Sequence, residues 1–308
     1  MSKTAFIFPG QGSQAVGMLA ELSEHYPVVT ETFAQASEAL GYDLWQLVQE
    51  GPVESLNQTD RTQPALLAAS VAIFRAYKQS GKANPDVVAG HSLGEYSALV
   101  CAGVIDFVDA IKLVALRGQL MQQAVPAGTG AMFAIIGLAD DAIAKACEES
   151  AQGDVVSPVN FNSPGQVVIA GEKNAVERAA AACKAAGAKM AVALPVSVPS
   201  HCELMKPAAD KLAEALTAIE FSTPTIELIN NVDVASTSNT AEIKDALIRQ
   251  LYCPVRWSET IQKMAESGVE NLYEFGPGKV LTGLTKRINK SLSAKAVNDS
   301  ASITALTQ

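Results

Sequence analysis

A serine between two glycines is the residue of this chain best placed to do chemistry. Ser92 stands between Gly90 and Gly94 in a G-x-S-x-G pattern, where the missing side chains let a strand turn sharply into a helix. The unpaired N–H groups at the start of such a helix favour negative charge. The pattern therefore predicts a nucleophile whose reaction forms an oxyanion. A glycine-flanked turn with an inert N-cap serine has the same spacing.

A serine nucleophile needs a general base, and histidine suits neutral pH because its unperturbed pKa is about 6.5. The chain has three histidines. His91 directly precedes Ser92, so its side chain should leave the strand end on the opposite side, and His25 is remote from any expected strand edge. His201 is therefore the predicted base, with a surface loop histidine as the alternative. No aspartate is an evident third member of a triad, so a backbone carbonyl or a side-chain amide could orient the imidazole of His201.

An arginine in the middle of an apolar helix face is a third candidate. The helix expected after Asp106 places Arg117 within about 60° of six apolar residues at 3.6 residues per turn; these are Ala110, Leu113, Val114, Leu120, Met121 and Ala124. A guanidinium stays charged, so burial demands an anion. That anion is an internal carboxylate or a substrate carboxylate held by the guanidinium fork. A stem that reaches water is the remaining alternative.

A glycine-containing loop follows the strand expected at residues 4–8. Its sequence is Pro9-Gly10-Gln11-Gly12-Ser13-Gln14. It lacks the Gly-Lys-Ser/Thr ending of a P-loop and does not fit G-x-G-x-x-G, which disfavours a nucleotide site. It could bring a backbone N–H close to a bound oxygen at the carboxyl edge of a sheet, or it could be a plain tight turn.

Composition narrows the class of protein. The 308 residues, 48% of them hydrophobic, suffice for about two domains or for one α/β domain with an insertion. The formal charge of −9 argues against a nucleic-acid binder, which needs a basic face. Five scattered cysteines without C-x-x-C spacing argue against a disulfide framework and a structural zinc site. No long apolar run and no leader pattern is evident, so we expect a cytoplasmic protein.

The order of the expected elements predicts a main α/β domain with an inserted unit. Residues 127–197 follow the order β-α-β-β-α-β of a ferredoxin-like subdomain, with a hairpin at Ser163-Pro164-Gly165. Residues 1–126 and 198–308 are assigned to an α/β-hydrolase-like catalytic domain with a parallel sheet and Ser92 at its nucleophile elbow. A nearly apolar helix is expected at 65–79, after Pro64. The small, polar chain after about residue 291 is expected to fray.

Together these features resemble the malonyl-CoA:acyl carrier protein transacylases of bacterial fatty-acid synthesis over nearly the whole chain. The shared features are Gly10-Gln11-Gly12-Ser13-Gln14, Gly90-His91-Ser92-Leu93-Gly94, Arg117, Ser200-His201, the inserted unit, Gln63 in Thr62-Gln63-Pro64, and Glu274-Phe275-Gly276-Pro277-Gly278. The resemblance implies that Ser92 attacks the thioester of malonyl-CoA and that His201 accepts its proton. It also implies that the main-chain carbonyl of Gln250 orients His201. Coenzyme A would leave, and the phosphopantetheine thiol of the carrier protein would then attack the malonyl-serine in a ping-pong scheme.

The same resemblance assigns roles to four further residues. Backbone N–H groups of Gln11 and Leu93 would bind the oxyanion, Arg117 would pair with the free malonyl carboxylate, and Gln63 would be a further substrate-binding residue. The residues before the histidine, Val198-Pro199-Ser200, match neither pattern associated with malonyl or methylmalonyl choice in polyketide synthases. Malonyl is thus inferred from the stand-alone architecture and Arg117.

The resemblance also implies the partners. These are malonyl-CoA and acyl carrier protein, with no nucleic acid, membrane, metal or protein-bound cofactor, and a monomer is the default expectation. Because the carrier protein is acidic, a basic patch should lie near the cleft. Lys286, Arg287 and Lys290 are one candidate, with a solvated helix face as the alternative.

Two other functions share parts of this pattern. A serine esterase or lipase would use the same corner, but it would normally add an acid between serine and histidine in chain order and would not need Arg117. A binding module could keep the fold without the chemistry. Reaction with malonyl-CoA separates these alternatives, because only a transferase should be acylated and release the acyl group mainly to a thiol.

Overall fold

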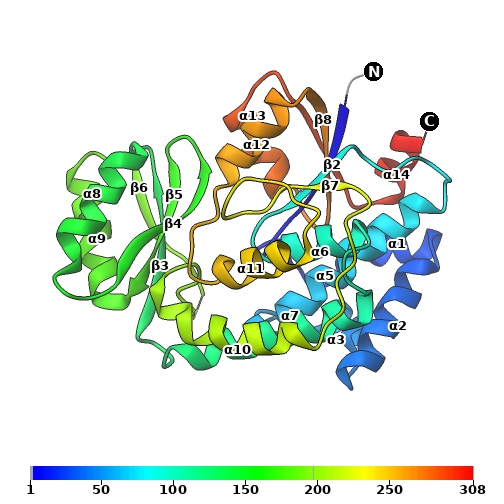
Figure 1. Ribbon diagram of the computed structural model, residues 1–308, viewed down its shortest axis with the longest axis horizontal. Helices are drawn as coiled ribbons and strands as arrows, with labels where there is room; N and C mark the ends of the chain where they lie inside the picture. The colour runs from blue at the N-terminus through cyan, green and yellow to red at the C-terminus, as the bar shows by residue number, and fades with distance from the viewer. Residues whose placement is uncertain (1–2, 197, 308) are drawn as a thin grey trace.

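The computed structural model describes residues 3–196 and 198–307 and has two sheets (Figure 1). The larger sheet is parallel, with strand order β7-β2-β1-β8-β9. Its strands are β1 (Lys3–Phe8), β2 (Val87–Gly90), β7 (Glu227–Leu228), β8 (Val269–Phe275) and β9 (Ser293–Val297). Every residue of β2 is buried, as expected for a parallel strand covered on both faces.

Helices cover this sheet and extend below it in Figure 1. They are α1 (Ala20–His25), α2 (Val28–Leu40), α3 (Leu44–Glu50), α4 (Val53–Leu56), α5 (Thr59–Lys78), α6 (Gly94–Cys101), α7 (Phe107–Ala124), α10 (Lys206–Thr217), α11 (Thr240–Gln250), α12 (Trp257–Glu266), α13 (Val280–Ile288) and α14 (Ser300–Thr307), with a 3₁₀ turn at Glu203–Met205. In the described part of the chain, no helix combines the length and apolar character needed to cross a membrane.

The smaller sheet lies to one side of the parallel sheet, with its helices on its outer face (Figure 1). It is antiparallel, in the order β4-β5-β3-β6. Its elements are β3 (Gly130–Ile136), α8 (Asp140–Ala151), β4 (Val156–Ser163), β5 (Gln166–Glu172), α9 (Lys173–Ala185) and β6 (Met190–Ala193). This is the β-α-β-β-α-β order of a ferredoxin-like unit, so the predicted fold class is confirmed. The domain limits stay a prediction, and residue 197, at one of them, lies outside the described residues.

Two predicted features of the main domain are wrong. Helix α5 begins at Thr59 rather than after Pro64. Burial of the residues on both sides of Pro64 compensates for the hydrogen bond that the proline removes and for the clash of its ring with the preceding turn. The segment after residue 291 is ordered as β9 and α14. β9 pairs with β8, and Ala294 and Val297 of β9 and Ile303 of α14 are buried, which compensates for the small polar side chains.

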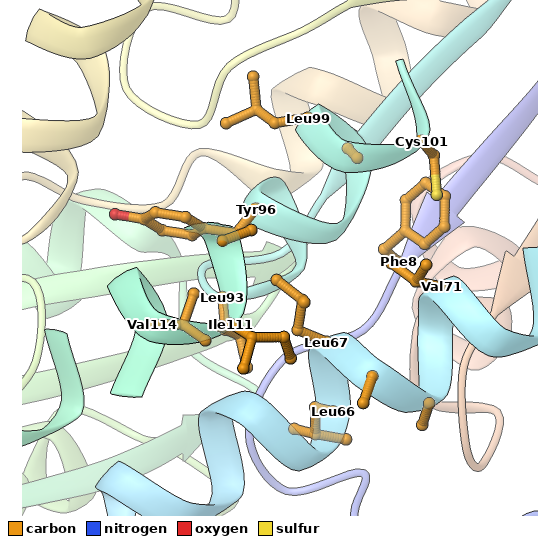
Figure 2. Packing of buried hydrophobic residues seen from close by; sticks show 14 of the residues in the cluster. Phe8, Leu66, Leu67, Val71, Leu93, Tyr96, Leu99, Cys101, Ile111 and Val114 are labelled. Atoms are coloured by element: carbon orange, nitrogen blue, oxygen red, sulfur yellow. The ribbon is translucent and has the colours of Figure 1, made fainter. Parts of the chain in front are cut away.

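The helix that follows Ser92 is packed deep in the main core. Seven of the eight residues of α6 are buried, and Figure 2 shows side chains of α5 and α7 around it. The contacting residues include Leu66 and Leu67 from α5, Leu93 and Tyr96 at α6, and Ile111 and Val114 from α7. The corner that carries Ser92 is therefore held on a rigid element, as a site that must fix an angle requires.

The two glycines of the G-x-S-x-G pattern are required by close backbone packing. A Cβ on Gly94 would lie 2.0 Å from the Phe8 carbonyl oxygen, and a Cβ on Gly90 would lie 1.8 Å from the Gly94 carbonyl carbon. Both neighbours are backbone atoms, which cannot rotate away. β2, β1 and α6 therefore approach one another more closely than any side chain would allow.

Replacing Gly94 with alanine is expected to lower the free energy of unfolding by about 3 kcal/mol or more, because the added methyl must displace β1. Urea-induced unfolding followed by circular dichroism measures this. The matched control is Gly283→Ala in α13, where a Cβ meets nothing within 4 Å and where alanine should stabilise by about 0.4–1 kcal/mol. Equal effects of the two substitutions would contradict the close-packing argument.

Candidate active site

The Ser92 corner occupies the residues between the end of β2 at Gly90 and the start of α6 at Gly94. Ser92 itself has a φ of 52°, in the left-handed region that is strained for a residue with a side chain. Its backbone N–H donates to Asn231 Oδ1 at 2.7 Å. The corner thus raises the serine side chain from the carboxyl edge of the parallel sheet, where such folds place their ligands.

The structure brings Ser92 and His201 together. Ser92 Oγ lies 2.8 Å from His201 Nε2, and His201 Nδ1 lies 2.6 Å from the backbone carbonyl oxygen of Gln250. A carbonyl can only accept a hydrogen bond, so Nδ1 carries the proton and Nε2 presents its lone pair to the serine hydroxyl. This is the geometry of a serine activated by a general base. The orienting group is a carbonyl rather than the carboxylate an esterase would normally supply.

Burial sets the charge state of the histidine. His201 is 3% exposed, and burial, reinforced by the nearby positive charge of Arg117, lowers the pKa of His201 to about 3, although the hydrogen bond to the Gln250 carbonyl opposes this. The imidazole is therefore neutral over the physiological range of pH. Neutral imidazole is the form that can accept the serine proton.

A buried carboxyl group, Glu95, lies close to this pair. Its Oε2 accepts hydrogen bonds from the Asn231 backbone N–H at 3.0 Å and from Gln250 Nε2 at 2.8 Å. Burial raises the pKa of Glu95 to about 7, although these two hydrogen bonds oppose the rise. Glu95 is thus the group of this site that titrates near neutral pH.

These pKa values predict the pH profile of serine acylation. Because His201 stays neutral far below pH 6.5, the rate of acyl-enzyme formation in a Glu95→Gln variant should stay level between pH 8 and pH 5. A base with the unperturbed pKa would lose about tenfold in rate for each unit below about 6.5. Rapid-quench mass spectrometry measures the rate. If the wild-type rate profile has an inflection near pH 7 that is absent from Glu95→Gln, that inflection belongs to Glu95. An inflection near pH 6.5 that persists in Glu95→Gln would contradict a neutral, buried His201.

Arg117 is fully buried, and its partners are amides. Its Nη1 donates to Gln63 Oε1 at 2.8 Å and its Nη2 to Gln250 Oε1 at 3.1 Å. Its Nε has no hydrogen-bond partner among the described residues. Neither structural alternative for this arginine holds, because the side chain does not reach water and no described carboxylate forms an ion pair with it. A substrate carboxylate remains the anion for which this guanidinium is suited.

The Gln250 side chain stands between the two buried charges. Its Oε1 accepts from Arg117, and its Nε2 donates to the Glu95 carboxyl and, at 3.1 Å, to the Ser92 carbonyl oxygen. One amide therefore links Glu95 to Arg117 without a direct ion pair. In its ionised form Glu95 balances the charge of Arg117 through this amide. The donors of Arg117 are meanwhile oriented by neutral acceptors, which are easier to displace than a carboxylate.

A cavity of about 110 Å³ opens at the serine. It is lined by Gln11, Thr59, His91, Ser92, Met132, Asn160, Leu194, Val196, Val198, Ser200 and His201. Gln11 thus shares the cavity with Ser92, and Leu93 directly precedes the first turn of α6, whose N–H groups have no partner within the helix. Arg117 and Gln63 are not among the lining residues. They connect to the site through Gln250.

Several groups of this site were not identified from the sequence. They are Asn231, Glu95 and the side chain of Gln250. Only their positions could have indicated a role in the site: Asn231 follows β7 at the carboxyl edge of the sheet, and Glu95 directly follows Gly94. Of the other histidines, His91 lines the same cavity as Ser92 and its Nε2 pairs with Asn162 Oδ1 at 2.8 Å, so its expected departure on the side opposite to the serine is not confirmed; His25 is exposed. The described residues contain no group of three or more residues that could hold a metal ion.

A histidine-activated serine at a strand-to-helix corner defines an enzyme that forms acyl-serine intermediates. The family model of the acyl transferase domain matches residues 5–307, and the chain belongs to this family of acyltransferases.

The names of individual relatives indicate a narrower activity than the family model does. The malonyl CoA-acyl carrier protein transacylase of Salmonella typhimurium is 67% identical over 309 residues, 100% of both chains, and that of Escherichia coli K12 is 67% identical over 305 residues, 99% of both. An acyl carrier protein S-malonyltransferase structure from Vibrio cholerae is 72% identical, with a TM-score of 0.97 over 99% of this chain and 100% of that chain. A malonyl-transacylase solved in complex with a type II PKS acyl-carrier protein is 65% identical, with a TM-score of 0.98 over 99% of this chain and 98% of that chain.

Proposed function

We propose that this acyltransferase moves the malonyl group of malonyl-CoA to the phosphopantetheine thiol of acyl carrier protein, supplying fatty-acid synthesis. The observation that carries the proposal is the 2.8 Å contact between Ser92 Oγ and His201 Nε2, with Nδ1 held by the Gln250 carbonyl. Relatives about two-thirds identical over the whole chain are named for this reaction, and a similar transacylase has been solved with its carrier protein.

In the first half-reaction, Ser92 Oγ attacks the thioester carbonyl as His201 Nε2 accepts the hydroxyl proton. The carbonyl oxygen becomes an oxyanion, which the backbone N–H groups of Leu93 and Gln11 would stabilise. Collapse of this intermediate breaks the bond to sulfur. The proton on His201 passes to the departing coenzyme A thiolate, which leaves a malonyl ester on Ser92 and a neutral imidazole.

The second half-reaction reverses these roles. The carrier-protein thiol gives its proton to His201 as its sulfur attacks the malonyl ester, and the same N–H groups would bind the new oxyanion. When the intermediate collapses, the bond to Ser92 Oγ breaks and the serine recovers its proton from His201. The scheme uses only protein groups and requires no bound cofactor.

The substrate carboxylate would bind to Arg117. Gln63 and Gln250 already orient the guanidinium, and a carboxylate would replace one of these neutral acceptors with a charged one. Since the amide of Gln250 contacts both Arg117 and the Ser92 carbonyl oxygen, a carboxylate at Arg117 would be linked to the nucleophile through that amide. This connection would favour a three-carbon diacid over a simple acetyl group.

The basic cluster for the carrier protein also stays a proposal. Lys286 and Arg287 lie exposed in the last turn of α13, and Lys290 is exposed two residues beyond the helix. Arg287 Nη1 donates to Gln166 Oε1 at 2.7 Å, at the start of β5, which joins the cluster to the smaller sheet. An acidic carrier protein would meet this face. A cytoplasmic location and a monomeric state likewise remain predictions.

Mass spectrometry of the intact protein tests the proposed reaction. After mixing with malonyl-CoA, one malonyl group should be added and should map to the peptide that contains Ser92. Addition of phosphopantetheinylated carrier protein should then remove it and yield malonyl-carrier protein. Loss of the adduct mainly to water, or acylation by acetyl-CoA at the same rate as by malonyl-CoA, would contradict the proposal.

A further inference from the structure

A buried asparagine closes the Ser92 corner. Asn231 has no exposed surface, and its side-chain amide forms two short hydrogen bonds. Oδ1 accepts from the Ser92 N–H at 2.7 Å, and Nδ2 donates to the Gly90 carbonyl oxygen at 2.7 Å. One planar amide thus bridges the peptide groups on either side of His91.

This amide continues the hydrogen bonding of the sheet where the neighbouring strand stops. β7 pairs with β2 only at Val87 and Val88, and the last ladder contact is the Ile229 N–H to the Val88 carbonyl at 3.1 Å. In a regular parallel strand the next residues would bond to Gly90 and Ser92 through their backbone. The backbone N–H of Asn231 instead donates to Glu95 Oε2, and its side chain takes over both contacts.

The hydrogen bonds to Ser92 oppose the natural preference of its backbone. A non-glycine residue with a φ of 52° carries strain of about 1–3 kcal/mol and persists only where its surroundings hold it. Asn231 holds the N–H of Ser92, and Gln250 Nε2 holds its carbonyl. Glu95 Oε2 in turn accepts hydrogen bonds from the backbone N–H of Asn231 and from Gln250 Nε2. The peptide groups on both sides of the Ser92 side chain are therefore fixed.

We propose that Asn231 is a positioning residue for acyl transfer, which holds Ser92 in the left-handed conformation that directs Oγ at His201 Nε2. It acts through the serine backbone and is not among the residues that line the cavity. The proposal rests on the proposed role of Ser92 as nucleophile, but not on the identity of the acyl group.

The Asn231→Asp variant gives a specific test. The ionised carboxylate of this variant would still accept from the Ser92 N–H, but it would face the Gly90 carbonyl with a second acceptor instead of a donor. A protonated carboxyl has one acceptor and one O–H donor, as the amide does. Burial beside Glu95 favours that protonated form. The titratable and charged side chains around this corner are Glu95, His91, His201, Arg117, Asp233 with its partner Arg249, and Arg256.

Two rates are measured from pH 5.5 to pH 8.5, each as a ratio to wild type at the same pH. One is acylation of Ser92 at saturating malonyl-CoA, and the other is sulfonylation of Ser92 by phenylmethylsulfonyl fluoride, which reacts with activated serines whatever their natural substrate. For Asn231→Asp both ratios should fall about 100-fold at high pH, as expected for a misplaced reacting atom, and should recover at low pH. The half-saturating malonyl-CoA concentration should change less than threefold.

Two further variants complete the test. Asn231→Leu has no side-chain donor or acceptor and should be slow at every pH, and circular dichroism is used to check that it folds. Asn230→Asp makes the same chemical change one residue away, where Oδ1 accepts from the Asp233 N–H, and its ratios should stay near one throughout. Wild-type rates for Asn231→Asp at high pH, or a loss that low pH does not reverse, would overturn the proposal. If wild type reacts with the fluoride but not with malonyl-CoA, the acyl group is wrongly assigned and the fluoride ratios alone decide the role of Asn231.

Discussion

Replacement of Ser92 with alanine is expected to abolish the covalent malonyl-enzyme and to lower malonyl transfer to carrier protein by about 10⁴-fold or more, as loss of the nucleophile does in other serine enzymes. The variant lacks the hydroxyl oxygen that lies 2.8 Å from His201 Nε2 and that is proposed to carry the acyl group. The proposed oxyanion donors and the proposed carboxylate site at Arg117 would remain, so the affinity for malonyl-CoA should change little. Intact-mass measurement after incubation with malonyl-CoA gives the adduct, and isothermal titration gives the affinity.

Ser97 provides a matched control in the same helix. It is 1% exposed, and its Oγ has no hydrogen-bond partner among the described residues. Ser97→Ala therefore removes a buried hydroxyl five residues from Ser92 and should leave acylation and transfer unchanged. A malonyl adduct that persists in Ser92→Ala would show that another group is the nucleophile.

The parts of the site that were predicted from sequence are those whose signals are local. The glycines around Ser92 are required by backbone contacts of 2.0 Å or less, and a requirement this strict shows in the residue types themselves. His201 was found by elimination, because so few histidines are available. The carbonyl of Gln250 came only from the family resemblance, since any residue supplies a carbonyl and its type carries no signal.

The groups that sequence reasoning missed act across long distances in the chain. Asn231 lies 139 residues from Ser92, and Gln250 lies 155 residues from Glu95. An asparagine or a glutamine with such a partner looks like any polar loop or helix residue until the sheet brings the segments together. The order of β7 beside β2 decides which side chains meet the corner, and a strand as short as Glu227–Leu228 has little pattern of its own.

The same limit explains the partners of Arg117. Its position in the apolar face correctly predicted burial, and burial of a charge required an anion. In the structure the nearby acidic group is Glu95, which is linked to the guanidinium only through the Gln250 amide. A pairing of this kind balances charge without occupying the guanidinium with a carboxylate. A buried arginine held in this way could take up a substrate carboxylate, as the proposed function requires.

Replacement of Arg117 with alanine is therefore expected to remove selectivity for malonyl over acetyl groups. Loss of one partner of a buried charge pair costs about 2–5 kcal/mol, so serine acylation by malonyl-CoA should slow by about 30- to 5,000-fold. Acetyl-CoA lacks the carboxylate, so its rate should not fall in parallel. The ratio of the two rates, measured on one sample by competition and mass spectrometry, cancels any loss of folded protein.

Arg75→Ala is the matched control, because it removes an arginine that is not part of the proposed site. Arg75 is half-buried against Phe107 and donates to Thr32 and Gln35, which are remote from the site residues, so the ratio should remain that of wild type. The hydrogen bonds of His201 to Ser92 Oγ and to the Gln250 carbonyl do not involve Arg117, so a change in the ratio of the two rates reports on recognition of the carboxylate. An Arg117→Ala enzyme that still prefers malonyl-CoA as strongly as wild type would show that the free carboxylate is recognised by another group.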